Sequence, residues 1–378
     1  MRIVHLLAPA DAGGLERVVH ALAIGQQRRG HEVVAVPVAE SWSSDHTFVA
    51  PLARAAVEVR PVVVPGRAYL RERALLATLL RDIRPDIVHS HGYHTDVVGT
   101  GVARAAGIAT VSTAHGFTAG GWKNLLYEQL DRRALKRMDA VAAVSRLLAD
   151  ELLEWGVPAD RVHVVPNAWS RIVTPLGRAD ARAELGLSPG AFVIGWVGRM
   201  SFEKGLDIMV DALGLIGDRA VTAVLMGDGR ERAAQEARTA ASGLGDRVRW
   251  TGMVPEAGRY FEAFDAIALS SRTEGIPMVV LEAMAAGVPL VVPMVGGIPD
   301  VVSPSEALLV PPEHPAALGA ALMSVFDDRP AAARRADAAR IRLDARFAEG
   351  PWLARYDEVY GVARERAAGQ RSGSTPGR

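Results

Sequence analysis

The segment FVIGWVGRMSFEKGLD (residues 192–207) contains a strand, a loop and the start of a helix. Residues 192–198 form an apolar run rich in β-branched and aromatic side chains, which predicts a buried strand ending at Gly198. A loop with Arg199 and Lys204 follows, and a helix opens at about Gly205. Strands that alternate with helices in this way predict a parallel sheet with helices on both faces.

The same alternation continues along the chain. LERVVHALAIGQQRRG (15–30), for example, repeats its apolar residues every three or four positions and ends at a glycine, which is typical of helix C-termini. The predicted strands are RIVHLLA, EVVAVPV, VEVRPVVV, DIVHSH, ATVSTAH, AVAAVS and VHVVPN in the first half, and FVIGWVGR, VTAVLMG, VRWTGMV, AIALSS, PLVVPM and ALLVPP in the second. They predict an α/β protein of two Rossmann-like domains with parallel sheets facing across a cleft, where ligands bind at strand carboxyl ends.

The length of 378 residues suits two domains rather than one core. They meet near the loop-like stretch PNAWSRIVTPLGRAD (166–180), which places the first domain at 1–168 and the second at 169–348. The pattern becomes all helical beyond Pro330, and residues 349–368 are predicted to form a last helix. The polar, glycine- and serine-rich residues 369–378 are expected to form a disordered tail.

Composition excludes several functional classes. The 43 basic and 43 acidic residues give a formal net charge of zero, which argues against bulk nucleic-acid binding. The chain has no cysteine, and therefore no disulfide, thiolate metal site or cysteine nucleophile. The N-terminus resembles a first strand more than a secretory signal, and no run of 18 apolar residues is present. These features predict a soluble cytoplasmic enzyme.

Arg199 and Lys204 are the first candidate site. Two cations at a strand end beside a helix N-terminus can bind an anion, because free backbone N–H groups add to the side-chain charges. Lys204 is one of only three lysines in an arginine-rich chain, a mild indication that its position requires a compact ammonium. The alternative is a pair of solvated surface charges.

The segment TEGIPMVVLEAMAAG (273–287) is the second candidate site. Pro277 and Gly287 predict a helix over about 277–286, with Glu274 in the preceding loop and Glu282 inside the helix. Apolar residues surround Glu282, and a half-buried carboxylate needs hydrogen-bond donors, which sugar hydroxyls could supply. Alternatively, Glu282 is an ordinary exposed helix residue.

In this order, the two segments resemble the retaining glycosyltransferases of family 4, which have the GT-B fold. The family's signature is two glutamates separated by seven residues, as in Glu274 and Glu282. VLMGDG (224–229) is similar to the family's glycine-rich strand end, AGGLERVV (12–19) to its N-terminal glycine loop, and AVAAVS with VVPNA to the end of its first domain. The resemblance covers nearly the whole chain.

The resemblance implies that the first domain binds the acceptor and the second the nucleotide sugar, and that the helix over 349–368 crosses back to the first domain. Arg199 and Lys204 would hold the diphosphate, Glu282 the ribose and Glu274 the donor sugar, and His115 at the end of ATVSTAH would contact that sugar. The further donor-binding positions implied are Gly13, Gly14, Gly227, Gly275, Ile276 and Met278. No D-x-D sequence occurs, so no metal or other cofactor is expected, and cations would replace the metal. The alternative for His115 is a structural histidine.

Two further segments allow more than one interpretation. HSHGYH (89–94) presents His89, His91 and His94, which could ligate zinc, but no further histidine or acidic partner is evident nearby and an acceptor contact fits better. GWKNLLYEQLDRRALKRM (121–138) is basic and amphipathic, so it could lie on anionic lipid or be a docked helix with a solvated face.

Other functions fit the sequence less well. The first strand lacks the G-x-G-x-x-G turn of nicotinamide enzymes, and the chain has no G-x-x-x-x-G-K-[ST] loop. A nucleotide-sugar epimerase of the same fold and a non-catalytic sugar-binding protein remain alternatives. The main expectation is a retaining glycosyltransferase that moves a sugar from a nucleoside diphosphate to a hydroxyl of a carbohydrate, lipid-linked or small-molecule acceptor.

Overall fold

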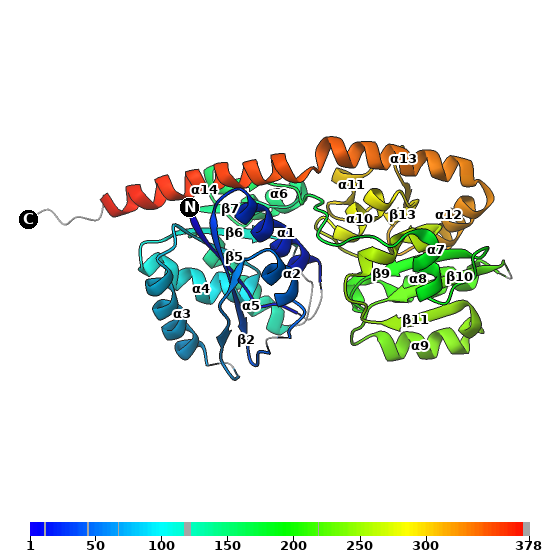
Figure 1. The fold of residues 1–378 in the computed structure, drawn as a ribbon, viewed down its shortest axis with the longest axis horizontal. Helices are drawn as coiled ribbons and strands as arrows, with labels where there is room; N and C mark the ends of the chain where they lie inside the picture. The colour runs from blue at the N-terminus through cyan, green and yellow to red at the C-terminus, as the bar shows by residue number, and fades with distance from the viewer. Residues whose placement is uncertain (11–12, 44, 67, 117–121, 218, 373–378) are drawn as a thin grey trace, which may run out of the picture. The chain divides into compact units, whose positions relative to one another are not determined.

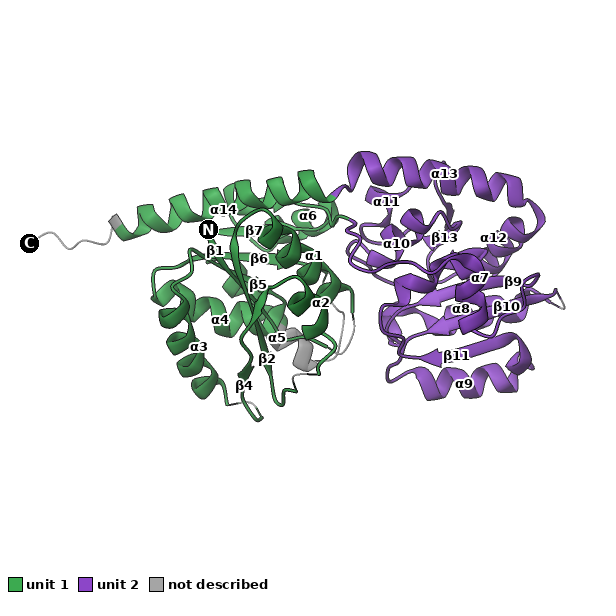
Figure 2. Ribbon diagram, in the orientation of Figure 1, with its two compact units in different colours: residues 1–168, 349–378 green, residues 169–348 purple. Residues whose placement is uncertain are grey.

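The computed structural model describes residues 1–378 except 11–12, 44, 67, 117–121, 218 and 373–378. The chain forms two compact units, one of residues 1–168 with 349–378 and the other of residues 169–348 (Figure 2). Both units are α/β layers built on a parallel sheet. No helix among the described residues is both long and apolar enough to cross a bilayer.

Unit 1 contains a parallel sheet whose first strand lies in its middle (Figure 1). In spatial order the strands are β3 (Glu58–Val59), β2 (Glu32–Ala39), β1 (Arg2–Leu7), β5 (Ile87–His91), β6 (Ala109–Ala114), β7 (Ala140–Ala143) and β8 (Val162–Val164), with β4 (Val62–Val63) also paired to β2. The chain builds outward from β1 to one edge, then returns and continues from β5 to the other. The switch point between β1 and β5 is where such sheets bind ligands.

The helices of unit 1 pack on both faces of this sheet. They are α1 (Gly14–Arg28), α2 (Val49–Arg54), α3 (Tyr69–Ile83), α4 (Tyr93–Ala105), α5 (Trp122–Leu135), α6 (Arg146–Glu154) and α14 (Glu349–Ser372). Successive side chains of a strand point to opposite faces. On β1, Val4 and Leu6 therefore pack in an apolar core with α3 and α4, whereas His5 points to the other face and bonds Gln26 of α1.

Unit 2 repeats the same topology. Its parallel strands lie in the order β11 (Val248–Gly252), β10 (Val221–Met226), β9 (Phe192–Val197), β12 (Ala266–Ala268), β13 (Leu290–Pro293) and β14 (Leu308–Val310). The helices are α7 (Arg178–Glu184), α8 (Leu206–Leu215), α9 (Arg232–Ala241), α10 (Met278–Ala286), α11 (Ile298–Val301), α12 (Pro315–Asp327) and α13 (Arg329–Arg346). The switch point lies between β9 and β12. The segment FVIGWV is confirmed as a buried strand in the centre of this sheet.

Two local predictions were wrong. VEVRPVVV was predicted as one strand but forms β3 and β4, separated by Arg60 and Pro61, because proline has no N–H to donate to a ladder. The predicted tail begins too early, since α14 continues past Ala368 to Ser372. Gln370 donates from Nε2 to Oδ1 of Asp139 at 3.1 Å, which ties this last turn to the unit. Residues 373–378 lie outside the described residues.

Candidate functional site

The candidate site in unit 2 lies where two adjacent strands end. β9 leads into residues 198–205 and β12 into residues 269–277, and these strands pair in parallel at the switch point of the sheet. Their carboxyl ends therefore lie at the same edge. Residues from two distant stretches of sequence, the GRMSFEKG loop and the SRTEGIP loop, meet there.

Lys204 and Glu274 form an ion pair at this edge. Nζ of Lys204 donates to both carboxylate oxygens of Glu274, at 2.7 and 2.8 Å, and Oγ of Ser271 donates to Oε1 at 2.6 Å. The Glu274 side chain is only 6% exposed and that of Lys204 is 30% exposed. The nearly buried carboxylate of Glu274 is thus paired with an ammonium that still reaches solvent.

The position of Lys204 is fixed by the residues on either side of it. Phe202–Lys204 form a 3₁₀ turn, η2, and Gly205 then takes a left-handed conformation with φ of 62° at the start of α8. A Cβ on Gly205 would overlap the carbonyl oxygen of Ser270. Oγ of Ser270 donates to the Lys204 carbonyl at 3.1 Å, so the two strand-end loops are joined directly.

Glycines let the loops of this edge pack backbone against backbone. Gly227, which follows β10, has φ of 142°, and a Cβ there would overlap the carbonyl oxygen of Gly198. Gly296 stands in the same relation to the carbonyl oxygen of Glu274. Gly227 therefore has a structural reason to be glycine, which is separate from the donor contact predicted for it.

Arg199, the other predicted cation, is exposed. Within the part of the chain that the structure describes, its guanidinium has no ion pair or hydrogen bond, in contrast to Lys204. The two cations share one short loop, but only one of them is already engaged. Arg199 is therefore available to bind an anion at this edge.

Helix α10 is confirmed where the sequence places it. Pro277 caps its N-terminus and Gly287, with φ of 66°, its C-terminus. Glu282 is half-buried on this helix between the buried Leu281 and Ala283. Gly275, Ile276 and Met278 lie at the N-terminal approach to α10, and the amide of Gly297 donates to the carbonyl of Gly275 at 3.0 Å.

Sequence analysis missed Arg272 as part of this site. Its guanidinium donates to both carboxylate oxygens of Asp207, at 3.0 and 2.7 Å, and to the carbonyl oxygen of Phe202 at 2.7 Å. It also lies 4.0 Å from the centre of the Phe202 ring, and the bond to Asp207 raises the pKa of Arg272. Arg272 thereby clamps η2, which carries Lys204. Its place two residues before Glu274 was the available signal.

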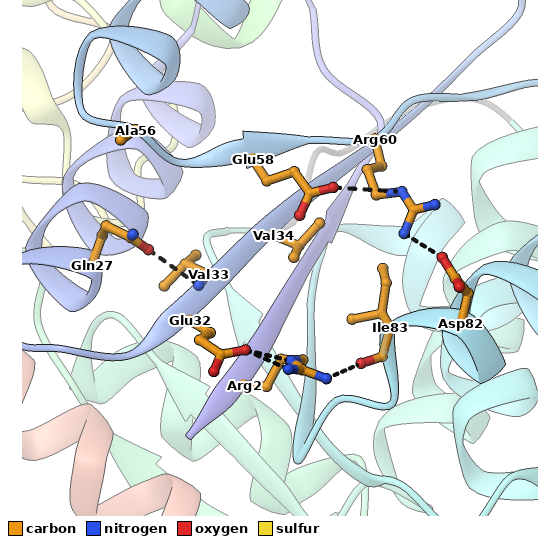
Figure 3. A pocket seen from close by; sticks show the side chains of 10 residues that line it. All are labelled: Arg2, Gln27, Glu32, Val33, Val34, Ala56, Glu58, Arg60, Asp82 and Ile83. Carbon is orange, nitrogen blue, oxygen red and sulfur yellow. Dashed lines mark hydrogen bonds and ion pairs between the residues drawn. The ribbon is translucent and has the colours of Figure 1, made fainter.

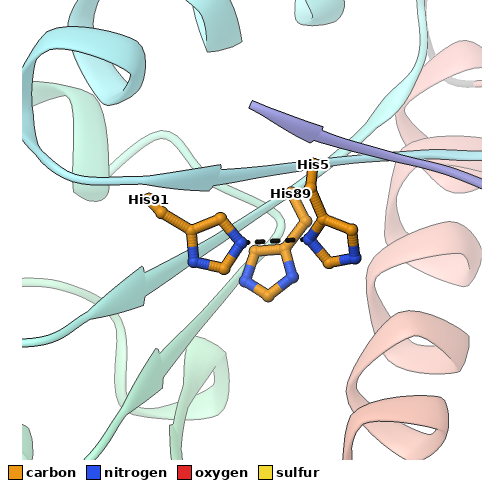
Figure 4. Close-up of side chains that lie close together, drawn as sticks. All are labelled: His5, His89 and His91. Carbon is orange, nitrogen blue, oxygen red and sulfur yellow. Dashed lines mark hydrogen bonds between the residues drawn. The ribbon is translucent and has the colours of Figure 1, made fainter. Parts of the chain in front are cut away.

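In unit 1, the histidines of β5 lie in a larger cluster than the sequence indicated. His89 and His91 are joined by His5 of β1, and the three rings each have a nitrogen within 4.8 Å of the others (Figure 4). His115 follows β6 and bonds His91. The expectation that no further histidine lies nearby was therefore wrong, because it could not foresee that β1 pairs with β5.

His94 does not belong to this cluster. Its Nε2 instead contacts both carboxylate oxygens of Glu72 on α3, at 2.8 and 2.9 Å. The sequence suggested His89, His91 and His94 as alternative metal ligands, and His5 takes the third place in the geometry. The ring nitrogens of His5, His89 and His91 are close enough to ligate one metal ion. Both ring nitrogens of His5 and of His89 are, however, already hydrogen-bonded to neighbouring side chains.

The glycine loop of unit 1 is described only in part. Gly13 is the extended N-cap of α1, and Gly14 is the first helical residue. The φ of Gly13 is −176°, which any residue can adopt, so its backbone conformation does not by itself require glycine. Residues 11 and 12 lie outside the described residues.

A cavity of about 370 Å³ opens beside the amino ends of β1 and β2, at the end of the unit 1 sheet that is opposite to the strand carboxyl ends (Figure 3). Its charged side chains are paired with one another, Arg2 with Glu32 and Arg60 with Glu58 and Asp82. It lies away from the strand carboxyl ends where ligands bind such sheets. These contacts stabilise the sheet edge rather than form the candidate site.

Comparison with known proteins gives a consistent result for both units. Residues 191–328 match the family model described as glycosyl transferases group 1, and residues 12–169 match glycosyltransferase family 4. The chain is 33% identical over 331 residues to a D-inositol 3-phosphate glycosyltransferase of Actinosynnema mirum, covering 76% of this chain and 78% of the relative. It is 31% identical to the 2-deoxystreptamine N-acetyl-D-glucosaminyltransferase of Streptomyces fradiae, covering 86% and 83%.

The fold is shared with solved structures. HepE of Anabaena, crystallised with UDP and glucose, superposes with a TM-score of 0.84 at 22% identity, over 96% of this chain and 99% of HepE. A sucrose-phosphate synthase of Thermosynechococcus elongatus superposes with a TM-score of 0.80 at 21% identity, over 96% and 98%. The predicted GT-B fold is thereby confirmed.

Proposed function

The chain belongs to the glycosyltransferases of group 1 and family 4, and we propose that it transfers a sugar from a nucleoside-diphosphate sugar to a hydroxyl, with retention of the anomeric configuration. One observation carries this proposal: the Lys204–Glu274 pair at the switch point of unit 2, with the exposed Arg199 in the same loop. Such an edge can bind a diphosphate and a polyhydroxylated sugar side by side.

The two cations have complementary roles in the proposal. Cleavage of the anomeric C–O bond leaves growing negative charge on the departing phosphate oxygens. Arg199 binds the diphosphate, while Lys204 donates two of its three N–H groups to Glu274 and directs the third toward the developing charge. Glu274 then accepts hydrogen bonds from hydroxyls of the sugar.

The remaining donor contacts follow from the resemblance. Glu282 binds the ribose hydroxyls, and the amides at the start of α10 lie near sugar and phosphate. Unit 2 is thus proposed to bind the donor and unit 1 the acceptor. His115, Gly13 and Gly14 of unit 1 are proposed to contact the donor sugar as well. The positions at which the backbone is proposed to contact the donor are Gly13, Gly14, Gly227, Gly275, Ile276 and Met278.

The proposed reaction uses no enzymic nucleophile. The acceptor hydroxyl attacks from the face that the diphosphate leaves, and its proton passes to the leaving phosphate oxygen. Because Arg199 and Lys204 supply the positive charge, we propose that no metal ion is needed. Transfer should therefore retain its rate in excess EDTA, and a loss of activity restored by Mg²⁺ or Mn²⁺ would contradict this.

The names of the relatives guide the choice of substrates to test. HepE was crystallised with UDP and glucose, and the relatives include transferases that act on an inositol phosphate and on an aminocyclitol. UDP-sugars are therefore the first donors to test, with GDP- and ADP-sugars next. Acceptors from polysaccharide, glycolipid and small-molecule glycoside pathways should each be included.

A direct experiment separates the proposed transferase from its alternatives. The protein is incubated with each nucleotide sugar, with and without acceptors, and products are identified by mass spectrometry and NMR. A transferase needs both substrates, an epimerase of this fold converts the donor alone, and a sugar-binding protein turns over neither. An α-linked product from an α-linked donor would support retention.

Peripheral contact with lipid through residues 121–138 is a further proposal. Residues 117–121 and the side chains of 122–127 lie outside the described residues. In the described half of α5 and just beyond it, Leu135 and Met138 are buried whereas Arg133, Lys136 and Arg137 are exposed, which supports a cationic outer face. Sedimentation with vesicles of phosphatidylglycerol, compared with phosphatidylcholine, tests the contact.

A further inference from the structure

A continuous chain of hydrogen bonds runs through unit 1 from the end of β6 to α14. We call it the histidine chain, and its members in order are His115, His91, His5, Gln26, Tyr360, His89, Thr113 and Tyr356. The successive distances are 3.1, 3.0, 2.7, 2.9, 2.8, 2.7 and 3.0 Å. Every member except His115 is buried, and His115 is half-buried.

All four imidazoles of the histidine chain are neutral at pH 7. Burial lowers the pKa of His5 and of His115 to about 4, and it lowers the pKa of His89 and His91 well below its ordinary value. A neutral imidazole has one nitrogen that donates and one that accepts. In a neutral ring that is hydrogen-bonded through both nitrogens, one nitrogen must therefore donate whenever the other accepts.

Gln26 determines that direction, because the two ends of a carboxamide are chemically different. Its Oε1 faces Nε2 of His5 and can only accept, so His5 donates there. Nδ1 of His5 must then accept from Nε2 of His91, and Nδ1 of His91 must accept from Nε2 of His115. On its other side, Nε2 of Gln26 donates to the Tyr360 hydroxyl.

These hydrogen-bond directions determine which nitrogen of His115 is protonated. Its Nε2 carries the proton and its Nδ1 carries a lone pair, which has no hydrogen-bond partner among the residues that the structure describes. His115 stands at the carboxyl end of β6, the edge of the sheet where ligands bind in this topology. The histidine chain thus ends in a hydrogen-bond acceptor, Nδ1 of His115, at the carboxyl ends of the strands.

We propose that Gln26 and Tyr360 are positioning residues that hold His115 in its Nε2–H tautomer, so that Nδ1 accepts a hydrogen bond from a sugar hydroxyl. This role for the acceptor rests on the proposed glycosyl transfer, whereas the tautomer is a property of the protein alone. Neither residue contacts His115. Gln26 acts through His5 and His91, and Tyr360 acts by accepting from Nε2 of Gln26 while its own hydroxyl proton is donated to Nδ1 of His89.

The test measures the tautomer of His115 directly. In protein labelled with ¹⁵N-histidine, two-bond and three-bond ¹H–¹⁵N correlations distinguish a protonated from an unprotonated ring nitrogen, and His115→Asn assigns the signal. The wild-type protein at pH 7.5 should show Nε2 of His115 protonated and Nδ1 unprotonated. Finding Nδ1 protonated instead would overturn the proposal, as would a stoichiometric metal ion in purified protein.

Two tyrosine variants provide a matched comparison on one helix. Tyr360→Phe and Tyr356→Phe each remove one buried hydroxyl from α14, but only Tyr360 bonds Gln26. Tyr360→Phe should add the second His115 tautomer, and Tyr356→Phe should leave the wild-type spectrum. Equal spectra for Tyr360→Phe and wild type would show that Tyr360 does not hold the amide, and would overturn its role.

A second pair of variants tests Gln26 by rescue. Gln26→Glu keeps an acceptor for His5 and should preserve the wild-type tautomer, whereas Gln26→Met removes it and should allow both. In transfer assays, kcat/KM should fall about twofold if the tautomers become equally populated, and further if the wrong one dominates. If wild-type protein proves not to transfer sugars, the proposed function fails while the NMR result still decides the tautomer.

Discussion

At the scale of single residues, the structure shows why Lys204 and Glu274 depend on each other. Each was predicted from its own motif, one as a phosphate ligand and one as a sugar ligand. Their ion pair could not be predicted, because 69 residues separate them and only the pairing of β9 with β12 brings them together. The same reason hid His5, which reaches His91 through the pairing of β1 with β5.

Lys204→Ala should lower kcat by about 10²–10³, or roughly 2.7–4 kcal/mol, because a preorganised donor to developing phosphate charge is lost. Steady-state kinetics with the donor and acceptor found in the substrate screen would measure it. Arg334→Ala is the control, since Arg334 is an exposed cation on α13 with no proposed role in binding. Turnover of Lys204→Ala within threefold of wild type would exclude a phosphate role for Lys204.

Glu282→Ala should weaken binding of the nucleoside diphosphate itself, because ribose hydroxyls are bound alike before and during transfer. Hydrogen bonds to a charged group contribute about 1.5–3 kcal/mol, so the Kd should rise about 10- to 100-fold. Isothermal titration calorimetry measures this, with Glu236→Ala on α9 as the control. Unchanged affinity would return Glu282 to a structural role on α10.

At the scale of elements, the described fold follows closely from local pattern. Alternating strands and helices, Pro277 before α10 and Gly287 after it were all legible in the sequence. Pro61 also indicated a break, but the β-branched residues around it favoured a single long strand. Arg272 is different, because its partners Asp207 and Glu313 lie on elements whose closeness only the assembled sheet determines.

Two glycines of one strand–helix unit should respond to alanine in opposite ways. Gly205→Ala should destabilise the protein by about 2 kcal/mol or more, because alanine is strained at positive φ and its Cβ would overlap Ser270. Gly214 lies within α8 with open space where a Cβ would stand, so Gly214→Ala should stabilise by about 0.5–1 kcal/mol.

Urea unfolding of both glycine variants measures the difference in free energy. Gly205→Ala should also reduce kcat, because Gly205 follows Lys204 and sets its position, whereas Gly214→Ala should leave kcat unchanged. If both variants lost the same stability, the close contact between Gly205 and Ser270 would not be a determinant of the fold.

At the scale of the whole molecule, buried histidines should control stability in acid. Burial lowers the pKa of six histidines: His5, His20, His89, His91, His115 and His163. The unfolded chain binds their protons near pH 6.5, but the folded chain binds them only at lower pH, about 4 for His5, His20 and His115, so stability is lost as the pH falls below 6.5. Asp96, Asp131 and Glu151 oppose the trend, because burial raises the pKa of Asp96 to about 6, that of Asp131 to about 9 and that of Glu151 above its ordinary value.

Since six histidines outnumber three carboxyl groups, the free energy of unfolding should decrease as the pH falls from 6.5 toward 4. Urea titrations at pH 7.0, 6.0 and 5.0 measure it. Asp131→Asn removes one opposing carboxyl, so in that variant the decrease should be steeper than in the wild type. A free energy of unfolding that is constant or rises over this range would show that the histidines are not buried in neutral form.

The return of α14 to unit 1 also affects the order in which the protein can fold during synthesis. Residues 349–372 complete unit 1, yet they are synthesised after the whole of unit 2. Unit 2 is one contiguous stretch and can finish folding while the ribosome still holds the end of the chain. Until α14 has been synthesised, Gln26 and His89 lack their partner Tyr360, so unit 1 begins before unit 2 in sequence but is completed after it.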